Sequence, residues 1–433
     1  MKIAVVGAGI SGLSCAWRLV QAGLDVTLFE AGDYFGGHSH TVDVTLDGVS
    51  HGVDTGFLVF NHTTYPQLVG LFEQLQVPTA ASDMSFSVRL PVSAAPGART
   101  LEWAGGNLDS VFSQRRNLFS MKFLGMLRDI LRFNRQAAAL AITQATEGAM
   151  PELSLGQFLD AHGYGAQFRH WYLLPMAACI WSCPSEQMLA FPLATFVRFC
   201  HNHGLLQIKD RPQWRTVKGG SRVYVERLLA GIPQRRLACP VHAVRRNGQG
   251  ARSVTLDSAA GSEHFDQVVL ACHSDQALAL LADCRADERG VLGAIAYQAN
   301  RAVLHTDASC LPANRKAWSA WNYQARAGSA AQVCVHYLIN QLQPLPFRTP
   351  VIVSLNALDE PDPACVLGRF DYAHPVFDAA AIAAQARLPA LQGRQNTWFA
   401  GAWTAYGFHE DGLKSGLAVA DALLGTAALC HAA

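Results

Sequence analysis

Three glycines near the start of the chain have the spacing of a phosphate-binding turn. Gly7, Gly9 and Gly12 follow the pattern G-x-G-x-x-G, and Glu30 lies 23 residues after Gly7. In such a motif the first glycine permits a tight turn, the second lets the backbone approach a pyrophosphate, and the third lets a helix pack closely on a strand. A carboxylate about 20 residues further on accepts hydrogen bonds from the ribose hydroxyls, and its charge repels a 2′-phosphate. Together these residues predict a dinucleotide site.

The elements that must position these residues can be recognised around the motif. Residues 2–7 form a short β-branched apolar run, typical of a strand buried in a parallel sheet. Residues 11–23 place apolar side chains at helical spacing, and residues 25–32 predict a second strand with Glu30 at its end. The helix N-terminus between the strands offers free N–H groups and the positive end of its dipole to a pyrophosphate. A glycine turn without a ligand is the alternative, and the acid at Glu30 disfavours it.

The composition restricts the class of protein. At 433 residues, half of them hydrophobic, the chain is long enough for two domains. Its net charge of +1 gives no reason to expect nucleic acid as a partner. The eleven cysteines are scattered, without C-x-x-C pairs or zinc-ligand spacing, which is typical of reduced cytoplasmic proteins. The chain enters a strand at Ile3 and holds no run of about 18 apolar residues, so we expect neither a signal peptide nor a membrane-spanning helix.

The segment after Glu30 distinguishes flavin enzymes from pyridine nucleotide enzymes. The latter continue with alternating strands and helices, whereas residues 31–61 are glycine-rich and then strand-like. Here the sequence resembles the flavin-dependent amine oxidase superfamily, which includes protoporphyrinogen oxidase and the phytoene desaturases, and within it a bacterial branch of predicted FAD-binding proteins. Residues 36–41 match the superfamily element G-G-[RH]-x-x-[ST], with His38 where relatives commonly carry a phosphate-binding arginine. Residues 54–56 match an acid and a glycine just before the flavin.

Later segments extend the resemblance over most of the chain. The glycine pair and helix at residues 217–232 and the strand beginning at Val241 and His242 correspond to parts of the flavin domain in relatives, where that strand offers backbone groups to the adenine. Residues 398–424 resemble the superfamily's closing strand, loop and helix, with Ala402 where an acid is expected. In relatives this helix points its N-terminus at the flavin, and its dipole stabilises the anion of reduced flavin.

The resemblance implies FAD, and no second glycine motif follows a strand, so a separate NAD(P)H domain is not expected. No His or Cys stands in a recognised flavinylation motif, so we expect the FAD to be bound noncovalently. The FAD-binding residues that it implies are Gly7, Gly9, Ile10, Ser11, Gly12, Glu30, Ala31, Gly36, Gly37, His38, Thr41, Asp54, Thr55, Gly56, Val241, His242, Gly401, Ala402, His409, Glu410, Gly412 and Leu413.

The fold implied is α/β, or α+β overall. A Rossmann-like FAD domain of the amine oxidase and glutathione reductase type is expected at residues 1–85, 205–275 and 390–433. An interleaved substrate domain is expected at residues 86–204, as a helical insertion, and at 276–389, as a mixed or antiparallel sheet.

Catalysis by a flavin needs a shaped cavity that excludes water and at most one base, because hydride passes to the flavin N5 atom. His409 and Tyr406 precede the flavin-facing helix, so the resemblance places them near the isoalloxazine, with His409 as the candidate general acid–base. Trp181 is the candidate cavity wall, within an aromatic stretch at residues 170–206 that is otherwise read as ordinary core.

Other titratable residues give weaker signals. Lys209 and Lys218 match no motif and are expected to be solvated. His201 and His203 lack a third ligand, and two histidines of the trio 38, 40 and 51 belong to the flavin loop. We therefore expect no metal site.

A basic stretch at residues 112–136 bears on the substrate and on localisation. Its sequence predicts a helix with arginines 128, 132 and 135 opposite one apolar face, formed by Phe119, Phe123, Met126, Leu127 and Ile130. Such a helix can lie in a membrane interface, where its cations meet anionic headgroups. The alternative is a helix packed on the substrate domain with solvated arginines. We expect a cytoplasmic protein, with peripheral contact at the inner face of the membrane if the first alternative holds.

Three functional predictions remain. The leading one is an FAD-dependent oxidoreductase that dehydrogenates or desaturates a small hydrophobic substrate, such as an acyl chain, a lipid or a polyene. The second is an amine oxidase that forms an imine and releases hydrogen peroxide. The third is a redox-neutral flavin-dependent isomerase or a non-catalytic flavin-binding partner in a lipid pathway.

Overall fold

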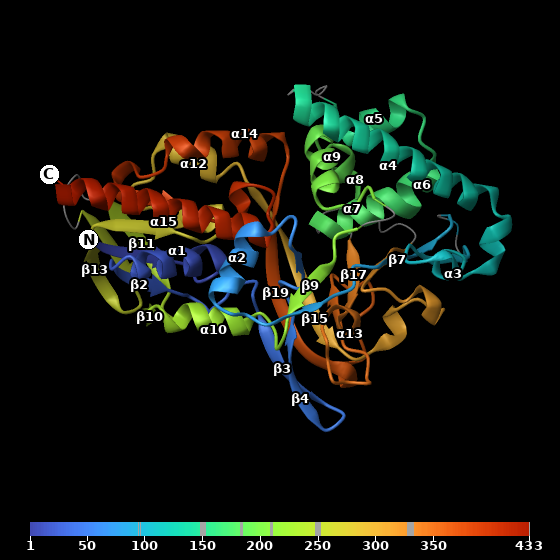
Figure 1. Ribbon diagram of the computed structural model, residues 1–433, viewed down its shortest axis with the longest axis horizontal. Helices are drawn as coiled ribbons and strands as arrows, with labels where there is room; N and C mark the ends of the chain where they lie inside the picture. Colours follow the sequence, from blue (N-terminus) through green and yellow to red (C-terminus); the bar gives the residue numbers. More distant parts are fainter. Residues whose placement is uncertain are drawn as a thin grey trace.

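A five-stranded parallel sheet lies at the centre of one lobe (Figure 1). The computed structural model describes residues 1–93, 95, 97–147, 153–181, 185–207, 211–246, 253–326 and 333–432. The strands are short apolar segments drawn from distant parts of the chain. Their order across the sheet is β10 (Gln234–Arg236), β2 (Asp25–Phe29), β1 (Lys2–Val6), β14 (Gln267–Leu270) and β20 (Thr397–Phe399).

Both faces of this sheet are covered, as an all-parallel sheet requires. Because side chains alternate along a strand, Ile3 and Val5 pack into one core while Ala4 and Val6 pack into another. The first core holds α1 (Ile10–Gln21), α2 (Pro66–Gln74), α10 (Arg222–Ala230) and α15 (His409–Ala432). The second holds α11 (Ser274–Leu280), α12 (Ala286–Leu292), α14 (Ala379–Arg387) and the antiparallel strands β11 (Val241–Arg246), β12 (Val254–Ser258) and β13 (Gly261–Phe265).

A seven-stranded mixed sheet forms the lower part of the other lobe (Figure 1). Its order is β19 (Val366–Val376), β15 (Ala296–His305), β18 (Ile352–Leu355), β17 (Cys334–Leu338), β16 (Trp321–Gln324), β7 (Phe86–Pro91) and β8 (Thr100–Ala104), with α13 (Ile339–Leu342) beside it. The β16–β7 pair is parallel and the other pairs are antiparallel.

Helices cover the upper part of that lobe, and the short α3 lies at its right-hand end beside β7 (Figure 1). They are α3 (Leu108–Val111), α4 (Met121–Glu147), α5 (Leu155–Ala161), α6 (Ala166–Phe168), α7 (Leu174–Trp181), α8 (Ser185–Leu189) and α9 (Leu193–Asn202), with a π-helical turn at Arg169–Leu173. Phe133, Phe158, Phe168 and Phe196 pack together inside this helical cap.

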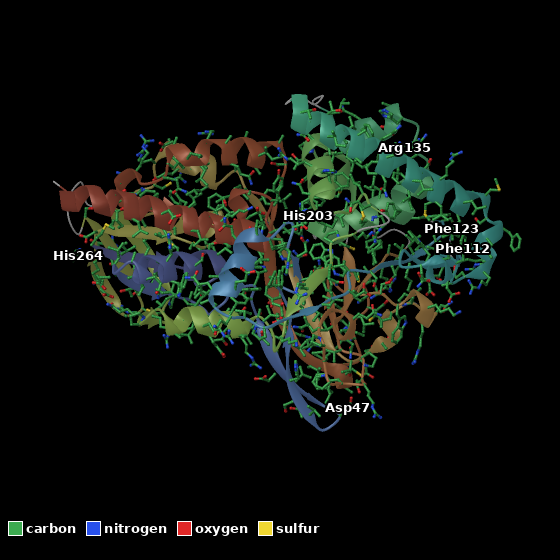
Figure 2. The ribbon with its side chains drawn as sticks, viewed as in Figure 1. Asp47, Phe112, Phe123, Arg135, His203 and His264 are labelled. Carbon is green, nitrogen blue, oxygen red and sulfur yellow. The ribbon has the colours of Figure 1, made fainter. Side chains whose placement is uncertain are left out.

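Short elements connect the lobes. The hairpin of β3 (Thr41–Leu46) and β4 (Val49–Asp54) turns at Asp47 and Gly48, which both have positive φ, and Figure 2 shows Asp47 at its tip. The Asp47 carboxylate accepts hydrogen bonds from the backbone N–H groups of Arg348 and Thr349 and so fixes the hairpin to the second lobe.

A small sheet joins β5 (Phe60–Asn61), β9 (Trp214–Val217) and β6 (Thr79–Ala81). Single 3₁₀ turns lie at Ala308–Cys310, Arg315–Ala317, Pro363–Cys365, Leu388–Ala390, Arg394–Asn396 and Ala402–Thr404.

The predicted mixed fold with a Rossmann-like domain is confirmed, and two details differ from the expectation. The segment expected as a helical insertion first supplies β7 and β8 to the seven-stranded sheet. Helices α11, α12 and α14 lie within the range expected for the substrate domain, yet they pack in the core of the parallel sheet. None of the helices in the described part of the chain combines the length and apolar character needed to span a bilayer.

The helix expected over residues 112–136 begins only at Met121. Arg115–Phe119 form a 3₁₀ turn (η1), and the Ser120 hydroxyl accepts a hydrogen bond from the Phe123 N–H at 3.3 Å. A serine at this position favours the start of a helix. Phe123 and Met126 are buried in a core with the seven-stranded sheet, whereas Phe119 is 88% exposed because it lies in the turn before the helix.

Candidate active site

A cavity of about 770 Å³ lies where the parallel sheet, the seven-stranded sheet and the helical cap meet. The C-terminal ends of β1, β2 and β14 and the loop after β20 open into it, which is where parallel α/β sheets bind their ligands. The predicted site residues that line it are Gly7, Gly9, Ile10, Ser11, Glu30, Ala31, Gly36, Gly37, His38, Thr55, Gly56, Trp181, Val241, Gly401, Ala402, Tyr406 and His409. Those that do not are Gly12, Thr41, Asp54, His242, Glu410, Gly412 and Leu413.

The turn between β1 and α1 has the form that the glycine motif predicts. Gly7 has a φ of +100°, and a Cβ there would lie 2.8 Å from the carbonyl oxygen of Ala271. Gly9 is the N-cap of α1 without a side-chain cap, and a Cβ on it would meet no atom within 4 Å. A Cβ on Gly12 would lie 1.9 Å from the carbonyl oxygen of Gly7, so this glycine serves the helix–strand contact rather than the cavity. The free N–H groups of the first turn of α1 are left for an anion.

Glu30 follows β2 and faces the same cavity. Its two carboxylate oxygens accept hydrogen bonds from the backbone N–H groups of Ala8 and Gly32, each at 2.8 Å. These bonds fix the carboxylate beside the phosphate turn, at the distance along the chain that a ribose-binding acid requires.

The second glycine pair brings His38 to the cavity. The Gly36 N–H donates to the Ala8 carbonyl at 2.9 Å, and a Cβ on Gly37 would lie 3.2 Å from Gly9 Cα, so this loop lies against the phosphate turn. The Nε2 atom of His38 is buried without a hydrogen-bond partner. Burial and the neighbouring His374, His273 and His409 hold the pKa of His38 well below its usual range, so the ring is neutral at neutral pH.

Asp54 and Thr41 join elements rather than line the cavity. The Asp54 carboxylate accepts bonds from the Thr41 hydroxyl at 2.5 Å, from the Ser221 N–H at 2.8 Å and from the Gln343 amide at 2.7 Å. Burial raises the Asp54 pKa to about 6, against the opposing effect of these donors. This cluster attaches the β3–β4 hairpin to α10 and α13, and it positions Thr55 and Gly56 at the cavity.

The C-terminal block approaches the phosphate turn through its helix. A Cβ on Gly416 would lie 2.2 Å from the carbonyl oxygen of Ser11, and one on Gly412 would lie 2.9 Å from the Ile10 side chain, so both glycines allow α15 to cross α1 closely. Leu413 is fully buried between the same helices. The Glu410 carboxylate accepts from the N–H groups of Gln67 and Leu68 at 2.9 and 3.0 Å, and it thereby caps α2.

His409 lines the cavity in a fixed orientation. Its ring stacks on Phe57 with the centroids 3.9 Å apart, and its Nε2 is 2.9 Å from the hydroxyl of Tyr224, which also bonds to the Ser39 hydroxyl. Burial lowers the pKa of His409 to about 3. A proton carrier near neutral pH needs a pKa closer to 7, whereas the His409 ring in this environment is neutral at neutral pH.

The part of the cavity away from the glycine turn is apolar and aromatic. Trp181 and Phe199 come from the helical cap, and Trp321, Tyr337 and Leu355 come from the seven-stranded sheet. Glu30 is the sole charged side chain among the described residues of the lining. The indole N–H groups of Trp181 and Trp321 are buried without a partner, which leaves two donors in an otherwise apolar wall.

Sequence reasoning missed a group of rings from β19, β15 and the N-cap of α11. Tyr372 and His374 of β19 lie 4.9 and 5.2 Å from the His38 ring, and His273 at the start of α11 stacks on Tyr297 at 4.4 Å. All four line the cavity. Residues 370, 372 and 374 all carry a ring, and a strand points every second side chain to one face. This alternation of ring-bearing residues could have shown that the three share a face.

The other predicted polar candidates are dispersed. Lys218 and His201 are exposed, and Lys209 lies outside the described residues. His203 stacks on Phe199 at 3.9 Å in the cavity wall, its Nδ1 is 2.9 Å from the Phe199 carbonyl oxygen, and burial lowers its pKa to about 4.

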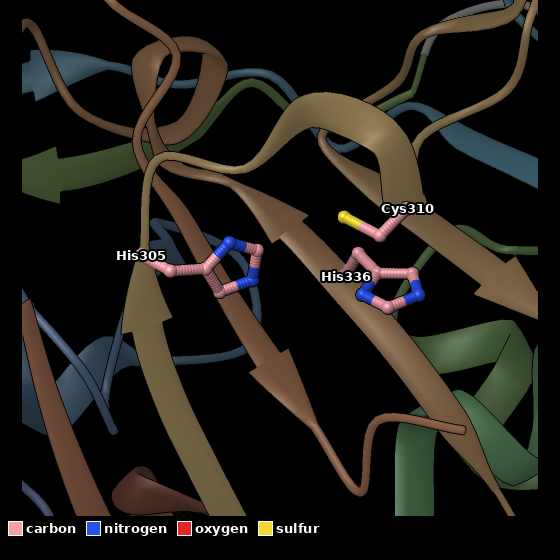
Figure 3. A group of neighbouring side chains, drawn as sticks. All are labelled: His305, Cys310 and His336. Atoms are coloured by element: carbon pink, nitrogen blue, oxygen red, sulfur yellow. The ribbon is translucent and has the colours of Figure 1, made fainter. Parts of the chain in front are cut away.

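A second group of potential ligand atoms lies in the seven-stranded sheet. One atom each of His305, Cys310 and His336 lies within 4.8 Å of the others, and Figure 3 shows the three side chains converging. The Ser354 hydroxyl is 2.6 Å from His305 Nε2 and 2.6 Å from His336 Nδ1, so one ring nitrogen of each histidine already has this hydroxyl as a partner. Burial lowers the pKa values of His305 and His336 to about 4 and about 3, which keeps both rings neutral.

Comparison with known proteins agrees with this geometry. The profile of the family described as flavin containing amine oxidoreductase matches residues 10–314. AofH, a Mycobacterium tuberculosis protein assigned to the flavin-containing monoamine oxidases, is 25% identical over 280 residues, which cover 63% of this chain and 56% of that protein. The chain thus matches little more than half the length of this relative.

Two solved structures share the fold over nearly the whole chain. A putrescine oxidase mutant has a TM-score of 0.68 at 16% identity, with 98% of this chain and 99% of the other covered. A fatty acid isomerase from P. acnes, described as producing CLA, has a TM-score of 0.64 at 14% identity, with 98% of each chain covered. The matching family is one of flavin-containing oxidoreductases. The chain belongs to the flavin-containing amine oxidoreductase family.

Proposed function

We propose that this flavoprotein dehydrogenates an apolar substrate, such as an acyl chain or a polyene. The observation that carries the proposal is the charge-free aromatic wall formed by the helical cap and the seven-stranded sheet. An ammonium group placed there would lose its hydration without gaining a carboxylate partner, whereas an acyl chain loses nothing and gains from burial.

The residues of this chain fit FAD at the other end of the cavity. Glu30 would hold the ribose, the turn from Gly7 to Ser11 would hold the pyrophosphate, and the unpartnered His38 Nε2 offers one more polar contact. When bound, FAD supplies the acceptor for two electrons and a proton. The protein would contribute partial enclosure, because the helical cap and the two sheets line the space beside the flavin end.

Amine oxidation is the second candidate. Tyr406 and Phe408 both line the cavity and both lie near Phe199, with ring centroids 6.5 and 4.7 Å from it. Aromatic faces of this kind suit an amine in its uncharged form. The fold shared with putrescine oxidase and with the CLA-producing isomerase is compatible with either substrate class.

Anaerobic reduction of the bound flavin tests the proposal. We expect long-chain acyl compounds or polyenes to bleach the flavin absorbance, and primary amines of similar size to leave it unchanged. Trp181→Ala should slow bleaching at least about tenfold, since it removes a large part of the wall, and leave the flavin spectrum intact. Trp318→Ala is the matched control, because Trp318 lies outside the described lining. Bleaching by amines alone would show the second candidate to be right.

A further inference from the structure

Exposed apolar side chains gather at one place on the surface. In the described part of the chain, eleven large hydrophobic residues are exposed, and seven of them lie between Leu108 and Ile142. Five of the seven fall within α3, η1 and the first turn of α4: Leu108, Leu118, Phe119, Met121 and Leu124. Leu108, Phe119 and Met121 are 78%, 88% and 81% exposed, so their side chains have almost no contact with the rest of the protein.

Cations are interleaved with these residues. Arg115, Arg116 and Lys122 are exposed in the same stretch, against the single acid Asp109. Asp109 is itself neutralised by Arg115 and by Lys316 at 2.9 Å. Lys122 and, further along α4, Arg135 form no ion pair within the described residues. We call residues 108–124 the docking tip.

The docking tip lies at the end of the molecule farthest from the parallel sheet (Figure 1), and Figure 2 places Phe112 and Phe123 there with Arg135 beyond them on α4. The inward side of α4 is already used, because Phe123 and Met126 are buried in the protein core. The exposed residues are therefore a second apolar set, distinct from the face that packs the helix. Monomeric soluble proteins seldom gather such side chains in one place without a partner.

We propose that the docking tip inserts into the surface of a lipid bilayer that carries anionic headgroups. Phe119, Met121 and Leu108 would enter the boundary between headgroups and acyl chains, while Arg115, Arg116 and Lys122 meet the phosphates. Arg116 and Lys122 form no ion pair within the described residues, and they lie beside largely exposed apolar side chains. This arrangement suits an interface with acyl chains on one side and anionic headgroups on the other. Docking here also brings the helical cap to the bilayer, and α9, which packs against α4, lines the cavity through Phe199 and, at its C-cap, His203.

Flotation of the flavin-loaded protein with vesicles tests this proposal. We expect binding to phosphatidylcholine–phosphatidylglycerol vesicles at low salt, little binding to phosphatidylcholine alone, and release as salt screens the cations. The double substitution Phe119→Ser and Met121→Ser should weaken binding at least about tenfold, since two large side chains no longer leave water. Lys122→Glu should weaken it about fivefold and reduce its salt dependence.

The matched control is Leu237→Ser with Leu367→Ser, which removes two exposed apolar residues elsewhere on the surface, 42% and 40% exposed. Equal binding by the docking-tip variant and wild type, or no binding of wild type to anionic vesicles, would overturn the proposal. A wild-type dimer that becomes monomeric in the docking-tip variant would assign the surface to a second copy of the chain instead. The proposal does not depend on the substrate, and the flavin absorbance of each floated sample shows that a failed variant is still loaded.

Discussion

The Glu30 carboxylate is oriented before any ligand is bound. Both of its oxygens accept backbone N–H groups, one from the phosphate turn and one from the loop after β2. A side chain held in this way loses little conformational entropy when a ribose binds, because folding has already ordered it.

Glu30→Gln therefore tests the cofactor end of the cavity at a single atom. The amide keeps the size of the side chain but removes the charge and one acceptor, and we expect FAD to bind about ten to a hundred times more weakly. Isothermal titration of the apoprotein with FAD measures this. Asp33→Asn, at an exposed acid nearby, is the control and should change the affinity by less than about twofold. An unchanged affinity in Glu30→Gln would contradict the assignment of Glu30 to the ribose.

His38 occupies the position where relatives commonly place an arginine. An ordinary histidine would lose a charged phosphate contact as the pH rises from 6 to 8, but the pKa of His38 is held well below that range by burial and by neighbouring histidines. We expect the FAD dissociation constant to differ by less than about threefold between pH 6 and pH 8. Affinity that falls steeply over this range, and falls less in His38→Asn, would show that His38 binds as an imidazolium.

At the scale of elements, the crossing of α1 and α15 determines how close the C-terminal block comes to the cavity. Gly412 and Gly416 lie on the face of α15 that contacts α1, and neither position has room for a methyl group. The two helices can therefore cross this closely only because both positions lack a side chain.

Two alanine substitutions in the same helix separate packing from helix propensity. Gly416→Ala would place its Cβ 2.2 Å from the Ser11 carbonyl oxygen, and we expect it to lower the free energy of unfolding by about 1–3 kcal/mol and to weaken FAD binding. Gly425→Ala meets nothing within 4 Å and should raise stability by up to about 1 kcal/mol. Urea unfolding of both variants measures the difference. If both variants changed the free energy of unfolding equally, α1 and α15 would be able to move apart without loss of stability.

Elements with local signals could be predicted from the sequence, and those that depend on register could not. The strand, turn and helix around Gly7 are specified by residues within one stretch, and the start of α15 by the resemblance at residues 398–424. Tyr372 and His374 reach the cavity because β19 pairs with β15 in one register, and that pairing leaves no mark in either strand alone. The predicted helix over residues 112–136 failed at its first turns because Ser120 starts a new helix there.

At the scale of the whole molecule, buried histidines make stability depend on pH. His305 and His336 have folded pKa values of about 4 and about 3, against 6.5 for the free side chain, so the unfolded chain takes up protons that the folded chain refuses. This contribution is fully favourable above pH 6.5 and is lost as the pH falls. Asp54 and Asp411 act in the opposite direction, because their folded pKa values are raised to about 6, and they offset part of the loss.

His38, His203, His374 and His409 have lowered pKa values as well, so we expect a net loss of at least about 1–4 kcal/mol of unfolding free energy between pH 7 and pH 5. Urea midpoints at the two pH values measure it. His336→Gln should reduce the dependence on pH, while His62→Gln, at an exposed position, should leave it unchanged. Higher stability at pH 5 than at pH 7 would show that the two carboxyls outweigh the histidines.

The parallel sheet also governs when, during its synthesis, the protein becomes able to take up its cofactor. The Lys2 N–H donates to Asp266 across a separation of 264 residues, and β20 and α15 come later still. Until β14 has been synthesised, β1 has only β2 to pair with, and β10 adds to the other side of β2. The phosphate turn then lacks both Ala271 and the crossing helix. Contacts between residues far apart in the sequence form slowly, and apolar surface stays exposed until they have formed. We therefore expect FAD capture to be a late event, because it needs β14, β20 and α15 in place.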